Sequence, residues 1–201
     1  MSEAVGGAPF EQPATFEFSP ENLEAAKKVI AKYPEGRQAS AVLPLLDLAQ
    51  RQHHNWLPRA AMDTVARMLD MAPIRVYEVA TFYTMFNLRP VGKHFVQICT
   101  TTPCWLRGSD DIVEACHKKL GIGIGETTAD GEFTLVEAEC LGACVNAPIV
   151  WIGDDFYEDL DGPKMEQLLD AFRAGNPPKP GPMIDRQTSA PVGGKTTLRD
   201  I

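Results

Sequence analysis

The sequence predicts a small all-α helical bundle followed by an α/β domain in which a mixed sheet is flanked by helices. Two patterns lead to this fold class. Over residues 19–91, apolar side chains recur at three- and four-residue spacing, as in amphipathic helices. From residue 93 onward, short alternating segments rich in strand formers take over, and helical segments separate them. The chain of 201 residues is long enough for two such domains.

Four short helices are expected in the bundle. The first begins at Ser19, a typical N-cap residue, has Pro20 in its first turn, and ends before Pro34. The other three are expected over residues 40–52, 58–69 and 73–80. Residues 1–18 contain Gly and Pro without a sustained period, so a flexible N-terminal arm is expected there.

The α/β domain is expected over residues 92–175. Its pattern predicts strands at residues 94–99, 132–139, 149–152 and 156–158, and helices at residues 109–120 and 163–174. This order of elements is a thioredoxin-like arrangement if the first two strands are parallel. Residues 176–201 are rich in proline, which predicts an extended C-terminal tail that is neither helix nor sheet.

Charge excludes one class of partner. The net charge is −8, and residues 92–175 hold 15 acidic against 6 basic residues. Such a surface repels phosphate groups and suits a basic or neutral protein, so nucleic acid is not expected as a partner.

The apolar stretches are too short to cross a membrane, and residues 1–7 lack the features of a signal peptide. A reducing compartment, such as the bacterial cytoplasm, is therefore expected.

Four of the five cysteines form two closely spaced pairs. These are Cys99-x4-Cys104 and Cys140-x3-Cys144, whereas Cys116 stands alone inside a predicted helix. Cys99 and Cys140 each follow the carboxyl end of a predicted strand, and the carboxyl ends of parallel strands open at the same edge of a sheet. The pattern therefore predicts one metal site with four thiolate ligands, and Cys116 is expected to be a buried helix residue.

Spacing alone leaves the metal open. Four thiolates can hold a zinc ion or a two-iron cluster, and these spacings favour the cluster. A redox dithiol is a third possibility, although the chain has no Cys-x-x-Cys sequence. Structural disulfides are disfavoured in a reducing compartment.

Two stretches resemble the signatures of a known family. CTTTPC at residues 99–104 and ECLGACVNAP at residues 139–148 are similar to those of the thioredoxin-like [2Fe-2S] ferredoxin subunit of NADH:quinone oxidoreductase, which is respiratory complex I; in bacteria this is the E subunit. The likeness extends to VYEVATFYTMFN at residues 76–87 and PVGK at residues 90–93, and it covers residues 19 to about 175.

The resemblance implies a non-catalytic, electron-carrying subunit. It implies one [2Fe-2S] cluster, with the ligands Cys99, Cys104, Cys140 and Cys144, and no catalytic residue. FMN and NADH are expected on a partner flavoprotein subunit, and the iron–sulfur subunit of the peripheral arm is a further expected partner. The implied location is the cytoplasmic side of the bacterial inner membrane, or the matrix side in a mitochondrion, with membrane contact only through the complex.

Two alternatives stay open at this point. Similar subunits serve NAD-linked formate dehydrogenases and hydrogenases. A zinc-stabilised adaptor module would belong to a different functional class.

Overall fold

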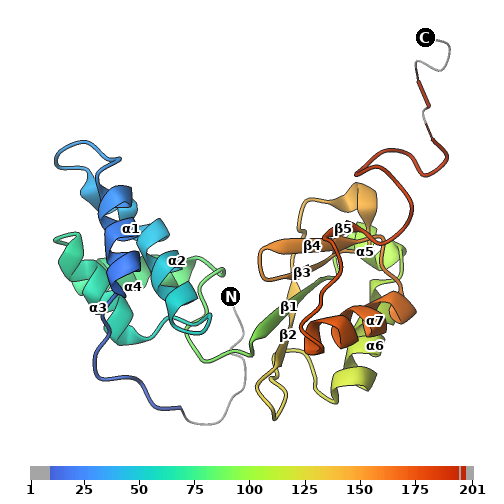
Figure 1. Ribbon diagram of the computed structural model, residues 1–201, viewed down its shortest axis with the longest axis horizontal. Coiled ribbons are helices and arrows are strands. Elements are labelled where there is room, and N and C mark those ends of the chain that lie inside the picture. Colours follow the sequence, from blue (N-terminus) through green and yellow to red (C-terminus); the bar gives the residue numbers. More distant parts are fainter. Residues whose placement is uncertain (1–9, 195, 198–201) are drawn as a thin grey trace. The chain divides into compact units, whose positions relative to one another are not determined.

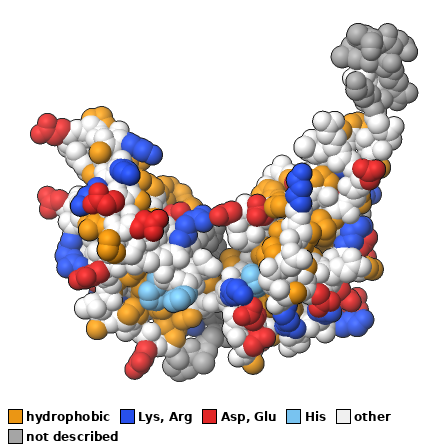
Figure 2. Space-filling model, viewed as in Figure 1, with side chains coloured by type: hydrophobic (Ala, Val, Ile, Leu, Met, Phe, Trp, Pro, Cys, Tyr) orange, Lys and Arg blue, Asp and Glu red, His pale blue; other side chains and the backbone are white. Residues whose placement is uncertain are grey.

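A computed structural model describes residues 10–194 and 196–197 and divides the chain into two compact units (Figure 1). The first unit comprises Met1–Val91 and the second Gly92–Ile201. No helix in the described part of the chain is long and apolar enough to cross a membrane. On the face shown in Figure 2, acidic and basic side chains are interspersed over each unit, so no patch of a single sign covers this face.

The first unit is helical. It contains α1 (Pro20–Ile30), a short 3-10 turn η1 (Gln38–Ala41), α2 (Val42–Gln52), α3 (Arg59–Met68) and α4 (Pro73–Phe82). The Ser19 side chain accepts a hydrogen bond from the backbone N–H of Asn22, so the expected N-cap of α1 is present. All four predicted helices are confirmed, with ends that shift by one to three residues because helix termini fray.

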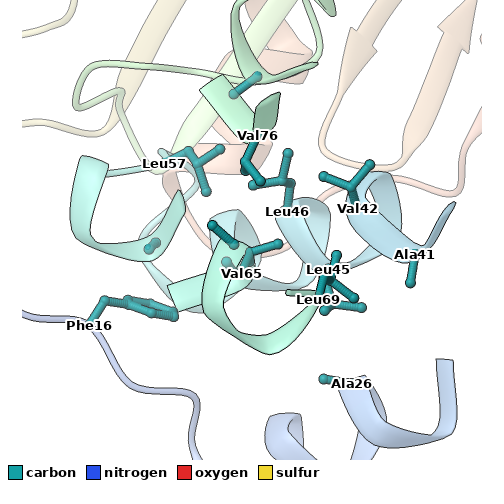
Figure 3. Close-up of a cluster of buried hydrophobic side chains, with 14 of the residues drawn as sticks. Phe16, Ala26, Ala41, Val42, Leu45, Leu46, Leu57, Val65, Leu69 and Val76 are labelled. Carbon is teal, nitrogen blue, oxygen red and sulfur yellow. The ribbon is translucent and has the colours of Figure 1, made fainter. Parts of the chain in front are cut away.

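The core of this unit lies between α2, α3 and α4 (Figure 3). Leu45 and Leu46 of α2, Val65 of α3 and Val76 of α4 point toward one another and are fully buried. Phe16, from the segment that precedes α1, also packs into this core. Burial of these apolar side chains holds helices that are too short to be stable alone.

The expectation of a flexible arm does not hold for the described residues 10–18. Phe16 and Phe18 are buried and stack edge to face with ring centroids 5.2 Å apart. The Thr64 hydroxyl donates a 2.9 Å hydrogen bond to the backbone carbonyl of Phe16. The segment shows no helical or strand periodicity because it packs on the bundle in an extended form, through the buried side chains of Phe16 and Phe18. Residues 1–9 lie outside the described residues.

The second unit is built on a five-stranded mixed sheet of order β2-β1-β3-β4-β5. The strands are β1 (His94–Cys99), β2 (Phe133–Ala138), β3 (Val150–Ile152), β4 (Asp155–Glu158) and β5 (Gly181–Pro182). β1 pairs in parallel with β2 and antiparallel with β3. The predicted thioredoxin-like arrangement with parallel first strands is therefore confirmed.

Helices α5 (Thr102–Leu106) and α6 (Ser109–Leu120) connect β1 to β2, and α7 (Gly162–Arg173) follows β4. α6 and α7 lie side by side (Figure 1), and Lys119 pairs with Asp170 across them at 2.7 Å. The core of the unit combines apolar side chains of both helices and the sheet, among them Ile112, Leu168, Ile98 and Leu135.

The C-terminal region differs from the predicted extended tail. Tyr157 and Glu158 of β4 pair in parallel with Gly181 and Pro182, which form β5 at the edge of the sheet. Proline is tolerated there because an edge strand leaves one row of backbone groups without a ladder partner. The same segment continues along the second unit through residue 190, where several of its residues are partly buried.

Candidate metal centre

The first cysteine pair is buried where β1 passes into α5. β1 ends at Cys99, and the chain turns through Thr101 into a five-residue helix that carries Cys104. Both cysteines are 1% exposed, and both pack with Ile149 and Ala147. This pair is therefore held by regular secondary structure and apolar packing.

The second pair lies in the irregular loop after β2. Register in the parallel pairing places Cys99 opposite Ala138, so Cys140 lies two residues beyond the matching end of the neighbouring strand. Gly142, at φ +81°, turns the backbone toward the 3-10 turn η2 (Cys144–Asn146). Cys140 and Cys144 are exposed, and their Sγ atoms are 3.4 Å apart.

The two pairs meet at one edge of the sheet. The Thr101 hydroxyl lies 3.3 Å from the Sγ of Cys99 and also hydrogen bonds to the Cys140 thiol. The backbone N–H of Leu141, in the second loop, hydrogen bonds to Cys99. Thr101 and Leu141 thus connect the two cysteine pairs that the spacing predicts as one site.

The pKa of one thiol in each pair is lowered. Burial opposes ionisation of Cys99, but hydrogen bonds from Thr101, Leu141 and Cys104 together lower its pKa. The pKa of Cys140 is lowered chiefly by a hydrogen bond from the backbone N–H of Gly142, and also by its hydrogen bond with Cys144. The donors from Thr101, Leu141 and Gly142 would also stabilise a metal-bound sulfur, which carries negative charge.

The pKa of the other thiol of each pair is raised. Burial raises the pKa of Cys104 to about 12, and its hydrogen bond to Cys99 adds to this effect. The pKa of Cys144 is raised chiefly by its hydrogen bond to Cys140. Thiols bind a metal as thiolates, so binding by all four cysteines would depend on pH, and the raised pKa of Cys104 adds to this dependence.

The donor set fits a two-iron cluster. Within the described residues, no group of three or more His, Cys, Asp or Glu side chains is arranged to hold a metal ion. The thiols are hydrogen bonded in two pairs, Cys99 with Cys104 and Cys140 with Cys144. A [2Fe-2S] cluster takes four cysteine thiolates, two on each iron, so the number and pairing of the donors match its needs.

Cys116 lies apart from this site. It is fully buried in α6 within the core of the second unit, as the sequence predicts, and burial raises its pKa to about 12. Its thiol therefore packs as a small apolar group.

Three supporting residues were not identified from the sequence as part of the site. Thr101 bridges the two cysteine pairs, and the Thr100 hydroxyl donates a hydrogen bond to the Glu137 carboxylate beside them. Asn146, 1% exposed, ends the turn that begins at Cys144. Thr101 and Asn146 lie within the two signature stretches, but their roles depend on contacts between loops that spacing does not reveal.

Comparison with known proteins identifies the family. Residues 26–173 match the family model for the thioredoxin-like [2Fe-2S] ferredoxin. The chain is 54% identical over 183 residues to a protein of Dictyostelium discoideum named NADH dehydrogenase [ubiquinone] flavoprotein 2, mitochondrial, covering 91% of this chain and 74% of that protein. It is 61% identical over 158 residues to the E subunit of NADH-quinone oxidoreductase from Rickettsia bellii, covering 79% of this chain and 95% of that protein.

A solved structure shares the fold. A chain of an NAD+-reducing [NiFe]-hydrogenase in its air-oxidised state superposes with a TM-score of 0.58 at 21% identity, covering 66% of this chain and 23% of that one. At this identity the match supports the fold alone, whereas the family model and the relatives support membership of the family. The chain therefore belongs to the family of thioredoxin-like [2Fe-2S] ferredoxins.

Proposed function

We propose that this chain is the electron-transfer subunit of NADH:quinone oxidoreductase, respiratory complex I, and that Cys99, Cys104, Cys140 and Cys144 hold its one [2Fe-2S] cluster. The observation that carries the proposal is the meeting of two thiol pairs at the carboxyl edge of β1 and β2. The relatives of 54% and 61% identity, which are named as parts of this enzyme, support the assignment to the complex.

The cluster supplies one-electron transfer when bound, and the residues of this chain hold it and set its surroundings. Thr101, Leu141 and Gly142 direct hydrogen-bond donors at the ligand sulfurs, which stabilises negative charge there. A cluster with four protein ligands has no open position for a substrate. Oxidation of NADH is therefore assigned to a partner subunit.

That partner is a flavoprotein subunit with FMN and the NADH site, and the iron–sulfur subunit of the peripheral arm is a second partner. The chain is peripheral, on the cytoplasmic side of a bacterial inner membrane or the matrix side of a mitochondrial one.

We assign cluster binding to residues 92–175 and a separate helical domain to residues 19–91. Electron-carrying subunits of hydrogenases or formate dehydrogenases are the alternative, but the solved hydrogenase shares 21% identity against 61% for the Rickettsia bellii relative.

The test is a metal and spectroscopic analysis of the full chain purified without oxygen. Iron, sulfide and zinc are quantified, and ultraviolet-visible and EPR spectra are recorded before and after dithionite. About two irons per chain and a paramagnetic signal that develops on reduction are expected. A colourless chain with stoichiometric zinc would instead show a structural zinc module and would overturn the electron-transfer proposal.

A further inference from the structure

The two cysteine pairs differ in what holds them. Cys99 and Cys104 are buried in β1 and α5, whereas Cys140 and Cys144 are exposed in a loop. The position of the second pair therefore depends on how the backbone of the loop is anchored. The anchor is Asn146, which is 1% exposed and lies two residues after Cys144 in the same 3-10 turn.

Asn146 is bound from two directions. Its side-chain amide nitrogen donates a hydrogen bond to the Glu158 carboxylate of β4 and a 3.2 Å hydrogen bond to the backbone carbonyl of Thr188. Both partners are acceptors, so the amide must direct its nitrogen toward them. The backbone carbonyl of Asn146 accepts a 2.7 Å hydrogen bond from the N–H of Asp159.

Thr188 belongs to a segment that we name the C-terminal strap, residues 181–190. The strap begins as β5, and its Met183 N–H donates a 2.9 Å hydrogen bond to the carbonyl of Glu158. Figure 1 shows this part of the chain returning to the sheet after α7. Two residues of β4 and its following turn hold Asn146: Glu158, at the end of β4, and Asp159, which follows it. The strap contacts both of them.

A buried ion pair joins Arg186 of the strap to Asp159. Nη1 of Arg186 lies 3.0 Å and 3.3 Å from the two carboxylate oxygens of Asp159, and the two side chains are 6% and 7% exposed. Nε of Arg186 donates a further 3.0 Å hydrogen bond to the carbonyl of Ala190. Removing one member of such a pair is strongly destabilising because the other charge is left buried without a partner.

We propose that the C-terminal strap positions Cys144 for cluster binding, and that Arg186 and Asn146 are the positioning residues. The path runs from Arg186 to Asp159, from Asp159 to the backbone of Asn146, and from Asn146 along the turn to Cys144. A second link runs from Thr188 directly to the Asn146 side chain. The strap lies beyond residues 26–173, the part of the chain that matches the family model.

The inference rests on the proposed function, since the positioned thiol is a proposed ligand. The test uses the full holo chain with Arg186→Gln, with Arg186→Lys as the conservative variant. Lys119→Gln is a control for the loss of one positive charge in the same unit, because it breaks a more exposed ion pair between α6 and α7. A truncation after Pro180 removes the strap, and a truncation after Gly194 keeps every strap contact named above.

Two measurements report on the strap. Hydrogen–deuterium exchange of a peptide covering residues 142–147 is compared with that of α6, and iron release to a chelator is followed together with the EPR line shape. Arg186→Gln and the truncation after Pro180 should accelerate exchange at residues 142–147 and iron release by about tenfold, with α6 unchanged. Arg186→Lys should restore part of the effect, while Lys119→Gln and the truncation after Gly194 should behave as wild type.

The outcomes separate this inference from the proposed function. Wild-type rates in both Arg186→Gln and the truncation after Pro180 would overturn the inference, as would acceleration that is equal in α6. If Arg186→Gln does not fold, the truncation after Pro180 decides alone, because it removes the arginine together with the segment that it ties down. A wild-type chain without iron would overturn the proposed function, and exchange at residues 142–147 would still test the strap.

Discussion

Cys99 lies directly opposite Ala138 in the parallel pairing of β1 with β2. This register decides where the second cysteine loop begins, because Cys140 follows Ala138 by two residues at the same edge of the sheet. A slip of one residue would turn each side chain of β2 to the other face of the sheet and would move the loop by one residue along the edge. The register therefore connects the core of the second unit to the geometry of the metal centre.

Replacing one proposed ligand should remove the cluster, and replacing the fifth cysteine should not. Cys144→Ser should lose most of the bound iron and the EPR signal of the reduced chain, because a serine oxygen is a poorer donor than a thiolate. Cys116→Ala should retain both and should cost about 1 kcal/mol of unfolding free energy, since it removes one buried sulfur. Iron analysis, EPR and chemical denaturation measure these effects; loss of iron from Cys116→Ala in a folded chain would contradict the assignment.

The metal-free chain should show unequal reactivity of its two exposed cysteines. The pKa of Cys140 is lowered and that of Cys144 is raised, so Cys140 should be alkylated by iodoacetamide at a lower pH than Cys144. Mass spectrometry of the labelled peptides across a pH series measures both. Cys140→Ser should then lower the pKa of Cys144, because the hydrogen bond to Cys140 is the largest cause of its shift. The reverse order of alkylation would exclude the hydrogen-bonding pattern described here.

Acidic residues beside the second loop should lower the cluster's reduction potential. Glu137 and Glu139 flank the end of β2, and reduction adds negative charge nearby. Glu137→Gln with Glu139→Gln should therefore raise the potential, measured by EPR-monitored redox titration. Glu132→Gln, at the other end of β2 and about 17 Å along the strand, is the control with the same change of charge. An unchanged or lower potential in the double variant would argue against this electrostatic effect.

Stability of the second unit should decrease as the pH falls through the range in which histidine titrates. The pKa of His94 is lowered by burial and by Lys93, and Glu132 only partly opposes this. The unfolded chain therefore binds a proton more readily than the folded chain, and the contribution of neutral His94 is lost as pH falls below the unfolded value of about 6.5. Urea denaturation of His94→Gln should show a smaller loss between about pH 7.5 and about pH 5.5 than wild type. An equal loss in both would assign the pH dependence to other groups.

Gly92 should not tolerate a side chain. A Cβ at this position would lie 2.6 Å from the backbone carbon of Phe133 and 2.9 Å from the nitrogen of Thr134. The Gly92 N–H also donates a 2.6 Å hydrogen bond to the Thr134 hydroxyl, which fixes this close approach. Gly92→Ala should reduce the free energy of unfolding by about 2 kcal/mol, as overpacking does elsewhere. Gly131→Ala is a useful comparison, since a Cβ there meets nothing within 4 Å, although its φ of +70° adds backbone strain.

Local pattern was sufficient for the regular elements. The strand at residues 94–99 and the helix at residues 109–120 have the ends that alternation, acidic first-turn residues and a terminal glycine predict. The hairpin of β3 and β4 likewise turns at Gly153, where φ is +65°. These signals are local because each depends on neighbours within one or two turns of the chain.

Spacing of the cysteines, together with the order of strands, determined that four thiols would share one edge of a sheet. Only the tertiary structure decided how that edge is supported. α5, the turn at Cys144–Asn146, β5 and the pairing of Arg186 with Asp159 were all missed. These features are short or depend on residues that are far apart in the chain. The burial of a charge pair or of an amide side chain produces no periodic pattern in the sequence that could predict it. The sequence by itself thus determined which four cysteines are the proposed ligands, whereas long-range packing decided what holds the exposed pair of them in position.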